Sequence, residues 1–288
     1  MKKRKTPRIM VLFFFIGLLI LFYPTLSNYY NEKNQSKSIY TYESIIDKYD
    51  EEKFQTLKEE AISYNKKLSS LKEPLLTYKS LKNYKKTLNV NNEGMMGYLT
   101  IDKIKVELPI YHGTSSSVLN SAVGHLEGTS LPVGGKGTHS VLSAHRGLPS
   151  AKLFSELDRL EIGDTFKITI LNEVHIYEVD KIEIVKPSNS SSLKIDKNND
   201  YVTLLTCTPY GINTHRLLVR GKRVLKETKK VYITTEGFKI NKLLVIPIIA
   251  VPIILLLLLL TLIKPVKRVN INKYNEFLYP NGKDYIGR

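Results

Sequence analysis

The sequence predicts a mainly β domain that closes into a barrel, with a helical segment before it and a membrane span near each end of the chain. Three observations predict this fold class. Two long uncharged apolar stretches lie near the ends of the 288-residue chain, a helical period follows the first, and short β-prone runs begin at Gly97. Seven or eight short strands in ~130 residues favour a closed or nearly closed barrel, because closure removes exposed strand edges.

The two apolar stretches are long enough to cross a bilayer, since about 20 helical residues span its hydrocarbon layer. They are residues 9–26, IMVLFFFIGLLILFYPTL, and residues 243–263, LLVIPIIAVPIILLLLLLTLI. The second predicts a transmembrane helix. The first could be a cleavable signal peptide, but a small-x-small cleavage site is not evident after it, so we expect an uncleaved signal anchor.

The net charge of +16 is concentrated at the two ends. Residues 1–8 carry five basic side chains, and residues 264–288 carry six basic and two acidic ones. By the positive-inside rule both ends should be cytoplasmic tails and the middle of the chain extracellular. We therefore expect an extracellular helical segment and connector over 27–94, a barrel over 95–225 and a linker over 226–242. This placement of charge argues against nucleic-acid binding.

A helix is predicted within residues 39–71, where apolar residues recur at steps of three and four. These are Phe54, Leu57, Ala61, Tyr64, Leu68 and Leu71. A partner-binding coiled coil would give the same pattern, but we expect a helix packed on the domain or rising from the membrane. Residues 27–38 read as a short polar spacer, Pro74 ends the helix, and residues 75–93 form a basic, Asn-rich connector.

Short β-type runs follow at regular spacing, most of them separated by links that contain Gly or Pro. The expected strands are 98–101, 106–111, 140–144, 165–171, 175–185, 201–207 and 216–224. Short helices fit at 116–122 and 151–157.

The stretch from 201 to 223, YVTLLTCTPYGINTHRLLVRGKR, carries the only cysteine and the densest chemistry. Cys207 ends one apolar run and Arg216 begins the next. Between them, Pro209 and Gly211 supply turn chemistry. If the two runs pair as a hairpin, the thiol and the guanidinium share one small site.

A lone extracellular cysteine cannot form an internal disulfide, and such thiols are core residues, intermolecular partners or reactive groups. An unassisted cysteine has a pKa near 8.5, so about 3% is thiolate at pH 7. A nucleophilic role therefore needs a neighbouring base or cation, usually a histidine. An acyl-transfer reaction also needs donors for the oxyanion, which a guanidinium provides.

His145 is the first histidine candidate, because it ends a predicted strand in HSVLSAHRGLPSAKLF. His125, in the polar loop VGHLEGTSLP, is the next. A metal site is also conceivable, but no histidine pair has HxxxH or Cys/His ligand spacing. We expect no metal and no other cofactor.

The stretch TLLTCTPYGINTHRLLVRGKR resembles the signature strand-loop-strand of sortases, specifically class C, the pilus-assembling sortases. The likeness extends through MGYLTIDKIKVELPIYHGTSSSVLNSAVGHLEGTSLPVGGKGTHSVLSAHRGLPSAKLF and covers about residues 95–225. The carboxy-terminal membrane span is also similar to that class. The resemblance implies a closed eight-stranded sortase-type β-barrel.

By this resemblance Cys207 is the nucleophile, His145 the general acid/base and Arg216 the transition-state stabiliser, chosen over Arg146, Arg220 and Arg223 by its position after the loop. The implied reaction cleaves an LPXTG-like sorting signal, forms a thioacyl-enzyme and joins the acyl group to a lysine of a pilin subunit. Pilin subunits are thus the expected partners of a monomeric, membrane-embedded enzyme.

One departure from the family pattern concerns an amino-terminal lid with an Asp-Pro-aromatic motif, which many class C members carry. None of the 12 prolines here follows an aspartate. We expect a lidless or weakly lidded enzyme; the alternative is that residues 75–93 cover the site by other contacts.

Three other functions stay open at this point. A wall-anchoring sortase would use the same three residues with an amine of the cell-wall precursor. A hydrolytic cysteine peptidase would release free carboxylates. A non-catalytic membrane-tethered scaffold would use Cys207 only for packing.

Overall fold

The structure, a computed structural model, describes residues 6–224 together with 252–253 and 255–256. The barrel and the elements packed on it form one compact unit, Leu21–Ile233, and the first part of helix α1 belongs to a second unit. The predicted linker, residues 1–5 of the amino-terminal tail, the whole carboxy-terminal tail and nearly all of the predicted span 243–263 lie outside the described residues.

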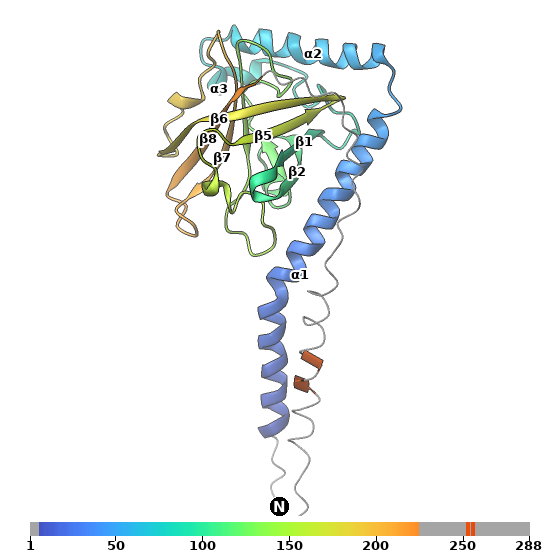
Figure 1. Ribbon diagram of the computed structural model, residues 1–288, viewed down its shortest axis with the longest axis vertical. Coiled ribbons are helices and arrows are strands. Elements are labelled where there is room, and N and C mark those ends of the chain that lie inside the picture. The colour runs from blue at the N-terminus through green and yellow to red at the C-terminus, as the bar shows by residue number, and fades with distance from the viewer. Residues whose placement is uncertain (1–5, 225–251, 254, 257–288) are drawn as a thin grey trace, which may run out of the picture. The chain divides into compact units, whose positions relative to one another are not determined.

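Eight strands close into a barrel in the order β1-β2-β3-β4-β7-β8-β6-β5, which confirms the predicted fold (Figure 1). The seven strands expected from sequence are present to within three residues at either end. The eighth, β3, was not expected because it is only three residues long. The bounds are β1 Met95–Ile101, β2 Val106–His112, β3 Val123–His125, β4 Thr138–Ser143, β5 Thr165–Ile170, β6 Glu173–Val185, β7 Asp200–Thr208 and β8 His215–Arg223.

Two of the strand pairs are parallel, β2 with β3 and β4 with β7, and the others are antiparallel. A parallel pair requires a long crossover connection, so strands far apart in sequence become neighbours. In β4–β7, His139 lies opposite Tyr201 and Ser143 opposite Leu205. The carboxyl ends of β4 and β7 therefore lie side by side.

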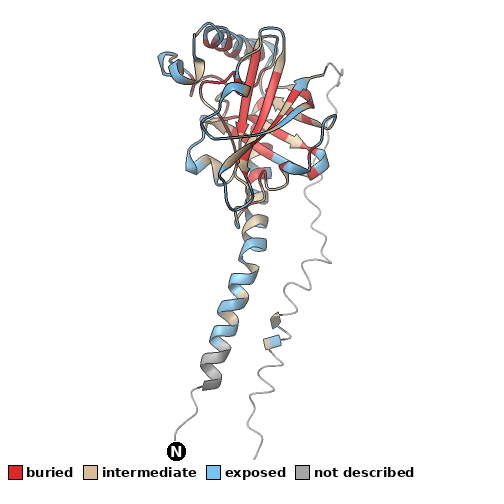
Figure 2. Ribbon diagram, turned by 90° about the vertical axis from the view of Figure 1, so that its left-hand side faces the viewer, coloured by how far each residue is buried: buried red, intermediate tan, exposed pale blue. Residues whose placement is uncertain are grey.

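Side-chain alternation on β7 separates two apolar clusters. Val202 and Leu204 belong to the main core, whose buried residues fill the barrel (Figure 2). Leu205 instead packs with a smaller cluster of Val141, Leu193 and Leu218. Because Cys207 is two positions beyond Leu205, it lies on the face of the smaller cluster, outside the barrel core.

Helix α1 runs from Thr6 to Ile46 and includes the predicted first span. Its segment Leu12–Ile46 is long and apolar enough to cross a membrane, a property that an amino-terminal signal sequence shares. The spacer expected at 27–38 is wrong, since those residues continue the helix. The Tyr42 hydroxyl donates to the carbonyl of Met96 at 2.9 Å and fixes this part of α1 to β1.

Helix α2, Glu51–Ser69, lies across the barrel (Figure 1) and buries the predicted apolar face. Asp50 caps its first turn by accepting a hydrogen bond from the backbone N–H of Lys53 at 2.9 Å. Asn65 donates to the carbonyl of Leu131 at 3.0 Å and accepts from its N–H at 2.7 Å. These bonds attach α2 to the loop between β3 and β4.

Short helical pieces join the main elements. They are α3 Pro74–Thr77, η1 Tyr78–Ser80, η2 Asp102–Ile104, α4 Ser116–Leu119, η3 Leu157–Arg159 and η4 Ser191–Leu193. The predicted helix at 116–122 is present in its first half as α4. The helix predicted at 151–157 is wrong: the chain forms consecutive turns there and only then the single turn η3.

Candidate active site

Cys207 and Arg216 are direct partners in the antiparallel β7–β8 ladder, as the predicted hairpin required. Side chains of directly opposed residues lie on one face of a sheet about 5 Å apart at Cβ. The loop between them is tightened by bonds from the N–H groups of Ile212 and Asn213 to the carbonyl of Pro209, at 3.1 and 3.0 Å. Gly211 has the positive φ of 75° that this turn requires.

The segment that carries His145 continues the β4–β7 pairing beyond the last residue of β4. The N–H of Ala144 donates to the carbonyl of Leu205 at 3.2 Å, and the Thr206 hydroxyl donates to the carbonyl of Ala144 at 2.8 Å. Extended by two residues beyond the last pair, Ser143 with Leu205, this register aligns His145 with Cys207. Because Ala144 is buried while its two neighbours are half-buried, the alternation of faces also continues.

Arg216 is half-buried and has no carboxylate partner within residues 6–224. One terminal nitrogen, Nη1, donates to the carbonyls of Asn213 and His215 at 3.2 and 3.1 Å. A guanidinium has five N–H donors, and within the described part of the chain the others are free for a ligand. The site thus combines a free thiol, an imidazole on a neighbouring segment and a permanent positive charge.

The smaller apolar cluster borders this site. Leu205 and Leu218 face each other one step along the same face from the Cys207–Arg216 pair. Leu75 of α3 packs against the cluster from outside. A Cβ on Gly128 would lie 3.0 Å from the Cα of Leu75, so α3 sits directly on the β3–β4 loop. This contact places the start of the connector on the small apolar cluster; whether the connector covers the site itself stays a prediction.

His125, the second candidate, lies in strand β3 instead of the predicted loop and is fully buried. Its Nδ1 is 2.9 Å from the Tyr84 hydroxyl and its Nε2 is 2.8 Å from the carbonyl of Ser130. Burial lowers its pKa to about 4, which keeps it neutral. His125 therefore fixes the connector to the barrel and has no access to the thiol.

His139, another buried histidine, has a structural role because both of its ring nitrogens lie within hydrogen-bond distance of the protein. His139 lies between the Thr203 hydroxyl, at 2.7 Å, and the carbonyl of Lys194, at 2.9 Å. Among the described residues no group of three His, Cys, Asp or Glu side chains could hold a metal ion.

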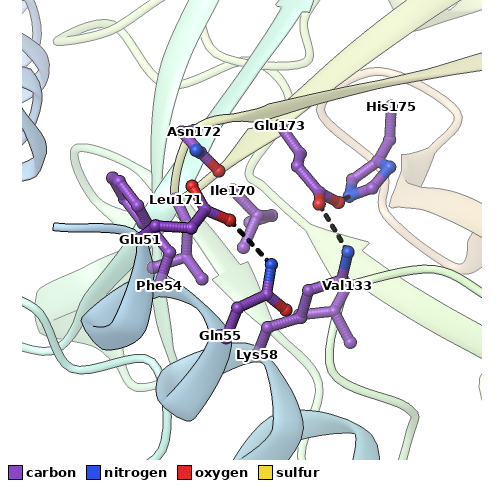
Figure 3. Close-up of a pocket in the computed structure, with 10 residues that line it drawn as sticks. All are labelled: Glu51, Phe54, Gln55, Lys58, Val133, Ile170, Leu171, Asn172, Glu173 and His175. Carbon is purple, nitrogen blue, oxygen red and sulfur yellow. Dashed lines mark hydrogen bonds and ion pairs between the residues drawn. The ribbon is translucent and has the colours of Figure 1, made fainter.

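A separate cavity of about 120 Å³ lies between α2 and the β5–β6 turn. Figure 3 shows Lys58 and His175 approaching the carboxylate of Glu173 there, with His175 Nε2 at 3.6 Å. None of the three candidate catalytic residues lines it. Its lining comes from α2, the β5–β6 turn and the residue Val133, so we assign it to the docking of α2.

Comparison with known proteins agrees with this geometry. The model of the Sortase domain matches residues 99–224. Sortase D of Bacillus subtilis is 32% identical over 131 residues, which are 44% of this chain and 63%, just under two thirds, of that protein. The crystal structure of sortase C1 from Streptococcus agalactiae matches with 46% identity and a TM-score of 0.61, over 66% of this chain and all of the other. The chain belongs to the sortase family, in class C.

A second class C structure, sortase C of Streptococcus pneumoniae, covers 67% of this sortase and 99% of its own chain, with 40% identity and a TM-score of 0.60. This sortase is a cysteine transpeptidase by family. Two features of the site were not predicted from the sequence. They are the contact of Leu75 with the apolar cluster and the buried side chain of Arg146, whose only sequence signal is its position after His145.

Proposed function

We propose that this sortase cleaves an LPXTG-like sorting signal and transfers the acyl group to a lysine amine of a pilin subunit. Cys207 is the nucleophile, His145 the general acid/base and Arg216 the oxyanion stabiliser. The observation that carries the proposal is the direct pairing of Cys207 with Arg216. The pilin partner is supported by the class C relatives, one of which is described in terms of its pilin substrate specificity.

In the first step the Cys207 thiolate attacks the threonine carbonyl carbon of the sorting signal. The bond from that carbon to the following glycine nitrogen breaks, and His145 gives the departing amine its proton. Arg216 donates to the oxygen that becomes negative in the tetrahedral intermediate. The product is a thioester between the signal's threonine and Cys207.

In the second step the lysine amine attacks the thioester carbon. His145 accepts a proton from the amine, the carbon–sulfur bond breaks, and an isopeptide bond forms as the thiolate is released. Water must be excluded for the amine to compete. The apolar cluster of Leu205, Leu218 and their neighbours, covered by Leu75, suits this requirement.

We also propose a two-pass membrane topology with both ends cytoplasmic and the barrel outside. The apolar helix at the amino terminus supports the first pass. The uncharged stretch at 243–263 and the basic residues beyond it support the second.

The test uses the full chain in detergent with an LPXTG-type peptide and an acceptor amine. We expect mass spectrometry to find an acyl adduct on Cys207 and an amide product. Cys207→Ala should give neither, and His145→Ala or Arg216→Lys should lower kcat by about 10²- to 10³-fold. Arg220→Lys is the matched control, because Arg220 is on the same strand and face but pairs with Asp180.

Equal turnover by Cys207→Ala would contradict the mechanism. A competition between a pilin with its lysine and a peptidoglycan stem peptide identifies the acceptor. Preference for the stem peptide would indicate a wall-anchoring enzyme, and free carboxylate with both amines present would indicate a peptidase.

A further inference from the structure

Arg146, the residue after His145, carries a charged side chain that is only 9% exposed. Its Nη2 donates to Asp158 Oδ2 of η3 at 2.6 Å. Its Nη1 donates to the Thr208 hydroxyl, at 3.3 Å, in the residue that follows Cys207. One guanidinium therefore joins three segments: the one that carries His145, the end of β7 and η3.

The Tyr210 ring also holds the Arg146 guanidinium in place. The guanidinium carbon lies 5.9 Å from the centre of the Tyr210 ring, in the range of a cation–π contact. Tyr210 also lies on Gly147, where a Cβ would come within 3.0 Å of the ring. Gly147 has a φ of 77°, so a side chain there would be strained as well as crowded.

Arg146 lies in the bend that follows His145, and its side chain contacts Thr208 and Asp158. Its Nε–H is buried and has no acceptor among the described residues, so the two terminal nitrogens alone hold it. A charge removed from water this far is costly unless it is paired. The fork geometry, which binds two partners at once, is specific to arginine.

We propose that Arg146 is a positioning residue that fixes the His145 segment against the end of β7 and so sets the distance between the imidazole and the Cys207 thiol. This proposal rests on the proposed function of His145 and Cys207. Besides this guanidinium, Ala144 on one side of His145 is bonded to Leu205 and to the Thr206 hydroxyl. On the other side, the N–H groups of Gly147 and Phe154 bond to the Ser155 hydroxyl and the His145 carbonyl, both at 3.1 Å. Among these bonds, the guanidinium is the contact made by the segment's own charged side chain, and it reaches both β7 and η3. A proton transfer requires hydrogen-bond reach, so small displacements reduce the rate.

The test compares Arg146→Ala, Arg146→Lys and the control Arg159→Ala in the full chain. Arg159 lies on η3 at an exposed position and, among residues 6–224, forms an ion pair only with Glu156. We expect Arg146→Ala to lower kcat by about 10- to 100-fold with little change in KM. Arg146→Lys should recover part of the loss, since an ammonium can keep one partner, and Arg159→Ala should behave like the wild type.

Two further measurements separate positioning from a general loss of structure. The rate of Cys207 alkylation by iodoacetamide, measured against pH, should lose its His145-dependent part in Arg146→Ala. Asp158→Asn, which keeps the side-chain shape, should show a smaller change in the same direction, and it serves as the test if Arg146→Ala does not fold.

The inference would be overturned if Arg146→Ala kept the kcat and the alkylation profile of the wild type. If Arg146→Ala does not fold, the same result in Asp158→Asn would overturn it. If the wild-type enzyme formed no amide product that depends on Cys207, the proposed function would be overturned instead. The alkylation profile would still report whether Arg146 positions the imidazole.

Discussion

His175 shows how one buried side chain makes this barrel sensitive to acid. It is 4% exposed, and its Nδ1 has no hydrogen-bond partner among the described residues. Burial, together with the charges of Arg223 and Lys58, lowers its pKa to about 3. The neutral ring therefore stabilises the fold above the unfolded-state pKa of about 6.5, and this stability is lost as the pH falls toward 3.

We expect acid to destabilise the wild type more than His175→Gln. Between pH 7 and pH 5 the histidine should cost about 2 kcal/mol, because the unfolded chain binds a proton that the folded chain excludes. Thermal unfolding followed by circular dichroism should show the melting midpoint of the wild type falling by roughly 4–8 °C more than that of the variant. Comparing each protein with itself removes any packing defect. Equal shifts would show that His175 accepts a proton while folded.

At the scale of elements, the short helix α3 of the connector contacts the small apolar cluster on the outer face of the barrel. Leu75 packs on the small apolar cluster, whereas the next residue, Leu76, is 74% exposed. The two leucines therefore form a matched pair, identical in chemistry and different only in contact.

We expect Leu75→Ser to increase the labelling rate of Cys207 by a thiol reagent. Loss of this apolar contact weakens the packing of α3 on the cluster by about 1 kcal/mol. The fraction of molecules in which α3 is detached should therefore rise roughly fivefold. Leu76→Ser should label like the wild type. Unchanged labelling in Leu75→Ser would mean that α3 does not limit access to the thiol.

Local patterns predicted most strands and the Cys207–Arg216 pair, because a hairpin is a local structure whose register follows from its turn. These local patterns failed where contacts with distant parts of the chain determine the secondary structure. Residues 27–38 look like a polar spacer but continue a helix whose residues contact the barrel, for example Gln35, which donates to the carbonyl of Ser121 at 2.7 Å. Strand β3 is too short to give a period, so His125 looked like a loop residue.

The position of His145 could not be predicted from local pattern at all. Its neighbour Ala144 meets Thr206 across 62 positions of sequence. Only the parallel β4–β7 pairing brings them together, and the sequence between them gives no local sign of that pairing. Its place at a predicted strand end made His145 a candidate, and the family resemblance supplied its pairing with Cys207.

For the whole molecule, the proposed topology places the only cysteine outside the cell, which makes it a natural reporter. An impermeant maleimide on intact cells should label Cys207. In a Cys207→Ala background, Lys5→Cys and Arg288→Cys should label only after lysis, and Asn198→Cys, at an exposed barrel position, should label at once. Labelling of either terminal cysteine in intact cells would contradict the two-pass arrangement.

The parallel pairing of β4 with β7 also bears on the order of events during biogenesis. Contacts between distant parts of a chain form late, after the intervening segments are in place. On the proposed topology, the sulfur atom consequently acquires its imidazole neighbour only when translation and export have delivered nearly the entire ectodomain. On the proposed mechanism, a chain exported only in part has no assembled pair of Cys207 and His145 and forms no acyl-enzyme.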